Sequence, residues 1–155
     1  NHEYIGGGDK PIAYLENHGI KILRDTALLV NNSFYIIGRE DLQKRHFSGK
    51  PRLDLEELMK DIDLTMPLIM LDHQPYNLGE AAKAGIDLQL SGHTRHGQLW
   101  PFVYVTNKLF EVSRGYYKKD STHYYVSTGY GTWGPPVRTG NRPEILLINL
   151  YFDSE

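Results

Sequence analysis

The sequence has no cysteine among its 155 residues. Disulfides, thiolate metal ligands and a cysteine nucleophile are therefore excluded from this chain. An excess of one charge is also lacking, since 17 Lys and Arg face 19 Asp and Glu. The formal net charge of −2 gives no nucleic-acid-binding signature. No apolar run in the sequence approaches the roughly 20 residues that span a bilayer, so we expect no membrane segment in this chain.

The composition is that of a globular domain, with 40% hydrophobic and 23% charged residues. A chain of this length can bury a core of its own, and we expect residues 1–155 to form one domain of the α/β (α+β) class. The cellular location stays open between the cytoplasm and the cell envelope.

Residues 66–92 predict a β-α-β unit. The apolar run 67–71 is typical of a strand buried on both faces, and 86–90 is the next strand. Between them, the alanine-rich stretch 77–84 predicts a helix that ends at Gly85. The two strands of such a unit are parallel, with a right-handed crossover.

The rest of the chain predicts shorter elements. The pair Asn31-Asn32 tolerates left-handed backbone and indicates a tight hairpin between two strands. A helix with Asp54 as its cap follows, and a second hairpin lies in the tyrosine-rich region. The expected strands are 20–23, 27–30, 33–37, 112–117, 122–127 and 145–151, and the expected helix is 53–62.

Polar turns that contain histidine follow both strands of the β-α-β unit. His73 lies in LDHQP and His93 in SGHTRHGQ. Because parallel strands end at the same edge of a sheet, we expect the two histidines to converge there. A third polar turn, Asn1-His2-Glu3, opens the chain. Imidazole nitrogens and an amide oxygen from separate loops are typical ligands of a divalent metal.

Three further histidines have no partner motif, and we predict surface or packing roles for them. They are His18, His46 and His123.

The three turns, in this order, resemble those of the calcineurin-like metallophosphoesterase superfamily. The similarity is to a bacterial branch with a GNHE turn, a strand-end histidine and an SGHTHGGQ-type turn. Residues 131–145 (GTWGPPVRTGNRPEI) resemble that branch's GxGxxGxPxRxGxxPEI stretch, and QLWPF at 98–102 also agrees. The resemblance implies a two-layer β-sandwich of mixed sheets flanked by helices, with two divalent ions held by strand-end loops.

The resemblance also implies roles for individual residues. Asn1, His73 and His93 would bind metal, while His2 would stabilise charge or protonate the leaving oxygen, oriented by Glu3. Two divalent ions, of Mn, Fe or Zn, would activate water to hydrolyse a phosphomonoester or phosphodiester. The substrate itself stays open among phospholipid, nucleotide and cell-wall phosphoesters.

Two departures from the family pattern affect the expected metal content. Arg95 stands where the family has a second histidine, and a guanidinium cannot ligate a cation because all its nitrogens are donors. Three readings stay open: His96 replaces the ligand, Arg95 clamps phosphate, or the first metal position is weakened or empty. The upstream DxH and GDxxD elements have no counterpart in the sequence. We therefore expect a C-terminal portion that binds two, one or no ions. It is expected to be catalytically incomplete and to associate with its N-terminal half or a second copy.

The glycine- and proline-rich loop near the C-terminus has two readings. Tyr130, Trp133 and Arg138 could line a substrate pocket and hold a phosphate or a sugar. Alternatively, Trp133 packs at the sandwich edge and Arg138 pairs with a carboxylate. The leading function is a metal-dependent phosphoesterase, and the alternative is a non-catalytic module that binds metal or phosphate through a degenerate site.

Overall fold

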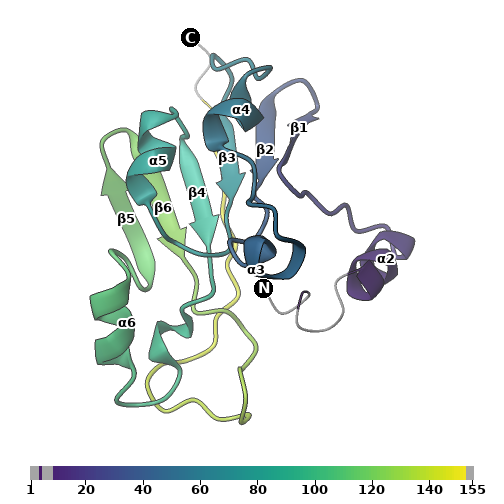
Figure 1. Ribbon diagram of the computed structural model, residues 1–155. Helices are drawn as coiled ribbons and strands as arrows, with labels where there is room; N and C mark the ends of the chain where they lie inside the picture. The colour runs from purple at the N-terminus through teal and green to yellow at the C-terminus, as the bar shows by residue number, and fades with distance from the viewer. Residues whose placement is uncertain (1–3, 5–8, 153–155) are drawn as a thin grey trace.

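A computed structural model describes Tyr4 and residues 9–152, so the predicted site residues Asn1, His2 and Glu3 lie outside the described part. The described residues contain one six-stranded mixed sheet with the strand order β1-β2-β3-β4-β6-β5 (Figure 1). The strands are β1 (Thr26–Val30), β2 (Phe34–Gly38), β3 (Leu68–Leu71), β4 (Leu88–Ser91), β5 (Gly115–Lys119) and β6 (Thr122–Val126). The predicted α/β class, with a mixed sheet and flanking helices, is confirmed.

The centre of the sheet is parallel and its two outer strands are antiparallel. Strands β2, β3, β4 and β6 run in one direction, while β1 and β5 are the hairpin partners of β2 and β6. The β1–β2 turn places Asn31 and Asn32 at φ of 48° and 52°, as the Asn pair predicted. The predicted β-α-β unit is also confirmed, as β3, α5 (Leu78–Lys83) and parallel β4.

The core lies between one face of the sheet and two short helices, α5 and α4 (Leu55–Met59). Tyr124 of β6 is buried there, and its hydroxyl donates to the Leu78 carbonyl at the start of α5 at 2.5 Å. This bond satisfies the one polar atom of a large side chain in an apolar setting. The buried cluster consists of Ile37, Leu55, Met59, Leu68, Met70, Leu78, Ala81, Ile86 and Tyr124.

The opposite face of the sheet is crossed by the extended segment 145–152, seen in yellow behind β3 and β4 (Figure 1). The predicted strand at 145–151 is wrong, because this segment has no strand pairing. It lies over the face of the sheet, where Phe152 stacks on Phe34 at 5.4 Å, rather than beside an edge strand. Most of its apolar side chains stay exposed, and Leu147 reaches 90%.

Further expectations also need correction. The segment 20–23 forms no strand, because Leu23 crosses β2 at close contact with Gly38 instead of pairing beside it. The predicted helix 53–62 is shorter, since only Leu55–Met59 is helical, and Asp54 at its N-cap makes no side-chain capping bond. Three helices were not predicted: α2 (Asp9–Asn17), α3 (Lys44–Ser48) and α6 (Val103–Leu109). Within the described part, no helix is long and apolar enough to cross a membrane.

Candidate metal centre

His73 and His93 meet at the carboxyl edge of the parallel strands. Each lies two residues beyond its strand, β3 and β4. Their ring centroids are 5.2 Å apart, with the ring planes at 79°. The Gly92 N–H donates to the His73 carbonyl at 3.0 Å, which ties the two turns together. The predicted convergence of the two histidines is confirmed, while their role as metal ligands stays a prediction.

A buried ion pair holds the end of β3 directly before His73. Asp72 accepts from Arg52 Nη1 at 2.8 Å, and the two side chains are 5% and 9% exposed. Burial raises the pKa of Asp72 above its ordinary value, and the neighbouring Arg52 opposes this rise. The Asp72 N–H also donates to the Leu90 carbonyl of β4 at 3.2 Å. These bonds fix where the His73 backbone leaves the sheet.

The turn that carries His93 has left-handed backbone, with φ of 65° at His93 itself. Thr94 stabilises it, because its buried hydroxyl donates to the Ser113 carbonyl at 2.6 Å and accepts from the His96 N–H at 3.2 Å. The Phe110 ring lies edge-on to the His93 ring, at 6.2 Å between centroids. The glycine-flanked motif therefore forms a compact turn with internal bonds.

Arg95 and His96 diverge within this turn. His96 Nδ1 lies 2.7 Å from the Ser113 hydroxyl, outside the set of residues that line the cavity at His73 and His93. Burial, followed by the charge of Arg114, lowers the pKa of His96. Arg95 does line that cavity, and its Nη1 donates to the Gly131 carbonyl at 2.7 Å. Burial and the charge of Arg138 lower the pKa of Arg95, although a guanidinium remains a cation at neutral pH.

Gln98 joins this turn to the loop that follows β6. Its amide nitrogen donates to the carbonyl of Trp133 at 2.9 Å, with the carbonyls of Pro135 and Val137 at 3.3 and 3.1 Å. Its amide oxygen accepts from the Trp133 N–H at 2.7 Å. Gln98 was not predicted as a site residue. Its signal was only its place in QLWPF, directly after the histidine turn.

Arg138 organises the same loop from within. Its Nη2 donates to the carbonyls of Thr128 and Gly129, both at 3.0 Å, and to that of Gly131. Its Nη1 donates to Asn141 Oδ1 at 2.6 Å. The partners of Arg138 are thus oxygens of neutral groups rather than the carboxylate considered above. Its guanidinium shapes the loop.

A cavity of about 480 Å³ opens between the two turns and this loop. Polar groups and apolar side chains both line its wall. Trp133 is part of this wall, whereas Tyr130 lies on the same loop, is 74% exposed and does not line the cavity. The lining comprises Gln43, His73, His93, Thr94, Arg95, Gly97, Gln98, Leu99, Phe102, Trp133 and Pro135.

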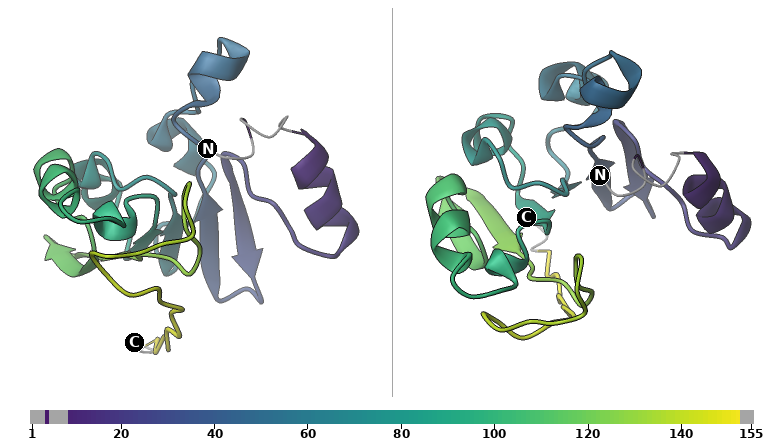
Figure 2. Two further views of the ribbon diagram at one scale, coloured as in Figure 1. Left: turned by 90° about the horizontal axis from the view of Figure 1, so that it is seen from below. Right: turned by 60° about the horizontal axis from the view of Figure 1, so that its bottom comes forward.

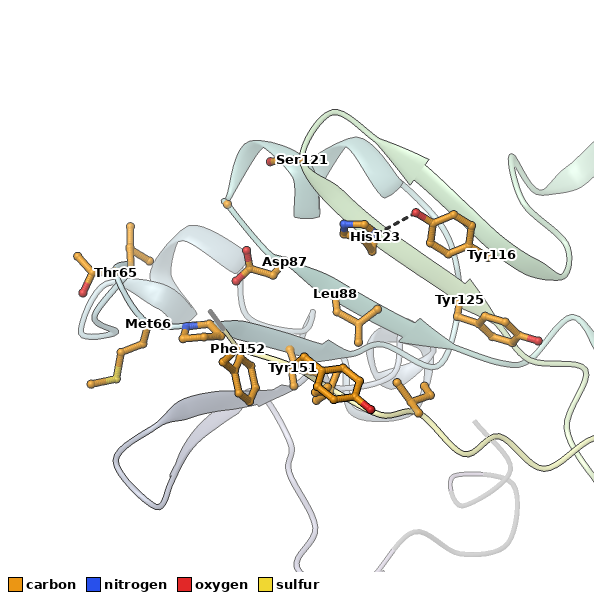
Figure 3. A pocket seen from close by; sticks show the side chains of 16 residues that line it. Thr65, Met66, Asp87, Leu88, Tyr116, Ser121, His123, Tyr125, Tyr151 and Phe152 are labelled. Atoms are coloured by element: carbon orange, nitrogen blue, oxygen red, sulfur yellow. Dashed lines mark hydrogen bonds between the residues drawn. The ribbon is translucent and has the colours of Figure 1, made fainter. Parts of the chain in front are cut away.

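A larger cavity, of about 750 Å³, lies elsewhere, between the sheet and residues 148–152 (Figure 3). It includes Asp87 and Ser121 at the amino ends of parallel strands, so it is remote from the histidine pair. His123 lies in it with Nδ1 2.9 Å from the Tyr116 hydroxyl, which agrees with its predicted packing role. This cavity is large because the C-terminal segment covers the sheet only loosely.

The residues present fit part of a metal site. Two imidazoles at one strand edge are suitable donors for Mn, Fe or Zn. Among Tyr4 and residues 9–152, however, no group of three or more His, Asp or Glu is placed to hold a metal ion. A catalytic zinc ion has at least three protein ligands. Any complete site therefore needs donors besides these two histidines.

The sequence is similar to curated proteins over almost its full length. It is 34% identical over 152 residues to a metallophosphoesterase of Aquifex aeolicus, covering 97% of this chain and 58% of that protein. A metallophosphoesterase of Campylobacter jejuni is also 34% identical, with 97% of this chain and 40% of that protein covered. The UDP-2,3-diacylglucosamine pyrophosphatase LpxG of Chlamydia trachomatis is 26% identical over 92% of this chain and 45% of its own length.

The chain thus spans about half the length of these relatives. No protein-family model and no solved structure matches it. The mixed sheet, the paired strand-end histidines and the similarity along 97% of the chain agree with one another. Together these findings support the calcineurin-like metallophosphoesterase superfamily as the family of this chain.

Proposed function

We propose that this chain contributes part of the active site of a metal-dependent phosphoesterase. The observation that supports the proposal most directly is the pair of imidazole rings 5.2 Å apart at the carboxyl edge of β3 and β4. Ligand sites of open α/β sheets favour this edge. His73 and His93 would each bind a divalent metal through a neutral ring nitrogen, with Asn1 adding an amide oxygen. The roles that the resemblance assigns to His2 and Glu3 complete the proposal.

When bound, the metal would polarise the phosphoryl oxygens and activate the attacking water. The residues of the chain bind and orient the substrate. Arg95 lines the cavity with one nitrogen held by the Gly131 carbonyl, so its other donors can be directed at a phosphate oxygen. The apolar side chains of the lining, which include Leu99 and Phe102, would limit the access of water to the ester.

The two described donors are too few for a dinuclear site, so we propose that further ligands come from outside the described residues. A longer chain or a second copy would supply them, which agrees with relatives about twice as long. Hydrolysis of a phosphomonoester or a phosphodiester suits the cavity. The pyrophosphatase among the relatives extends the candidate substrates to phosphoanhydrides.

The test is metal content per chain after incubation with Mn²⁺ or Zn²⁺, with hydrolysis of a chromogenic phosphodiester measured on the same samples. His73→Ala and His93→Ala should each lower the affinity for the metal at least tenfold, because the loss of one ligand leaves too few donors. The metal content per chain should fall accordingly. His46→Ala is the matched control, since His46 is exposed on α3 and is not among the residues that line the cavity, and it should bind as the unmodified chain does.

The outcomes separate the two candidate functions. Metal binding that depends on His73 and His93, together with turnover, supports the phosphoesterase. Histidine-dependent binding without turnover, even with the complete gene product, would instead indicate a non-catalytic binding module. Equal metal content in all three variants would remove both histidines from the ligand set and contradict the proposal.

A further inference from the structure

Five large aromatic side chains are exposed on the two segments that supply most of the lining of the histidine cavity, residues 92–110 and 128–143. Their exposure ranges from 56% for Phe102 to 74% for Tyr130. Side chains of this size are usually buried, and a cluster of exposed ones marks an interaction surface. We call this set the aromatic rim, and it consists of Trp100, Phe102, Tyr104, Tyr130 and Trp133.

Backbone and side-chain bonds hold the rim together although its members come from two distant segments. The Trp100 N–H donates to Thr139 Oγ1 at 2.8 Å, and Gln98 binds the backbone of Trp133 from both ends of its amide. Phe102 and Trp133 also line the cavity of His73 and His93. In the right-hand view of Figure 2, α6 and the loop after β6 lie next to each other, so the two segments that carry the rim are neighbours in the fold.

The Lys and Arg residues of these two segments are not balanced by acidic residues. Residues 92–110 and 128–143 contain no Asp or Glu, although the whole chain has a net charge of −2. They contain four cations, which are Arg95, Lys108, Arg138 and Arg142. Lys108 and Arg142 are exposed, so part of this charge faces solvent beside the aromatic side chains. The occupant of this surface is therefore expected to be anionic and partly apolar.

We propose that the aromatic rim docks on an anionic lipid surface. Tryptophan and tyrosine favour the boundary between headgroups and acyl chains, because each combines an apolar ring with a polar group. Exposed cations add attraction to anionic headgroups. A protein partner is the other class of occupant, and protein interfaces are also rich in aromatic side chains. The absence of any acidic residue from both segments favours the lipid.

Docking in this orientation would turn the histidine cavity toward the headgroup layer. If the proposed phosphoesterase function holds, its substrate would then be a phosphoester at the membrane surface. Such a substrate could enter the histidine cavity without leaving the bilayer. The docking itself requires no metal and no turnover, so it can be tested separately.

Both tryptophans of the chain belong to the rim, so intrinsic fluorescence reports directly on docking. The 155-residue chain is titrated without metal into vesicles of phosphatidylglycerol and phosphatidylcholine, or of phosphatidylcholine alone. The mixed vesicles should shift tryptophan emission to shorter wavelength, and brominated lipid should quench it. Pure phosphatidylcholine should bind about fivefold more weakly for each cation that contacts the surface.

Variants then locate the contact. Trp133→Ser and Phe102→Ser should each weaken partitioning roughly tenfold, as expected for removing one large side chain from partial burial. Tyr14→Ser is the matched control, because Tyr14 is 64% exposed on α2, outside the rim, and it should partition as the unmodified chain does. Lys108→Glu should weaken binding to mixed vesicles at least fivefold and leave phosphatidylcholine binding unchanged.

Emission that does not respond to anionic vesicles would overturn the proposal. So would equal losses for Phe102→Ser and Tyr14→Ser, which would show that the contact is not the rim. Quenching by brominated lipid uses the unmodified chain, so the test survives if a variant fails to fold. Absent phosphodiester hydrolysis, with lipid binding intact, would count against the phosphoesterase proposal alone.

Discussion

Gln98 offers the sharpest test of how the candidate site is held together. Its side chain is 7% exposed, and its amide bridges the histidine turn and the loop that carries Trp133. Three carbonyl oxygens face the amide nitrogen, and one backbone N–H faces the amide oxygen. Gln98→Glu keeps the size of the side chain but replaces the donor with a second acceptor. The introduced carboxylate would then face three carbonyl oxygens.

The magnitude follows from the bonds. An amide nitrogen has two hydrogens, so the substitution removes two full hydrogen bonds worth about 1 kcal/mol each. Unpaired acceptors in a nearly buried site cost a further ~1–3 kcal/mol. We expect the free energy of unfolding to fall by about 3 kcal/mol at pH 7. The exposed loop limits the loss, because it can detach locally before the sheet unfolds.

The assay is denaturant unfolding at pH 7 and pH 4, with amide hydrogen exchange of residues 129–141. The carbonyl oxygens would raise the folded-state pKa of the introduced carboxyl above its ordinary ~4.3. The folded state then binds the proton more tightly, so stability lost at pH 7 should partly return as the pH falls toward 4. Hydrogen exchange in the loop should accelerate at pH 7.

Asn107→Asp is the matched control. The amide oxygen of Asn107 accepts from the Ser113 hydroxyl, and a carboxylate keeps that acceptor. This variant should lose less than about 1 kcal/mol. The reasoning would be refuted if Gln98→Glu were as stable as the control, or if its loop exchanged at the unmodified rate.

Three further predictions concern the same edge of the sheet. Arg95→His, made in the complete protein, should raise metal stoichiometry toward two and increase phosphodiester hydrolysis if a ligand was lost at this position; elemental analysis and turnover check both. Arg52→Met leaves its carboxylate partner buried without its cation, so urea unfolding should show a loss of about 3–5 kcal/mol, whereas Lys60→Met, in an exposed pair, should unfold as the unmodified chain does. Gly97→Ala places a methyl group against the backbone at the start of α6 and keeps a φ of 74°, so thermal unfolding should show a loss of at least about 2 kcal/mol. Gly115→Ala has a similar φ but open space around the added methyl group, so it should lose only about 1 kcal/mol.

Local sequence patterns were sufficient to predict the structure where the type of one residue, or the period of the apolar residues, decides the backbone conformation. The Asn31-Asn32 pair tolerates positive φ, and the structure has it at both residues. The apolar run 67–71 and the helix before Gly85 identified the β-α-β unit. Since parallel strands end together, the approach of His73 and His93 followed from the pattern alone.

The sequence patterns gave wrong predictions where a segment could pack against more than one part of the fold. Residues 145–151 are as apolar as a strand, yet they cross the face of the sheet instead of joining its edge. Helix α6 was missed because its residues, VYVTNKL, have strand propensity. Propensity measures local preference, whereas the structure fixes α6 by its contacts with the histidine turn.

The sequence by itself determined the family, the mixed sheet and the edge at which the histidines lie, because these depend on order, period and turn chemistry. Only the tertiary structure decided how the loops around that edge use their polar groups. Gln98 binds carbonyls more than 30 residues away along the chain, and Arg138 binds carbonyls up to ten residues away. The His96 ring lies against the Ser113 hydroxyl. Such bonds depend on where distant backbone oxygens come to rest, and no local pattern of residues encodes that position.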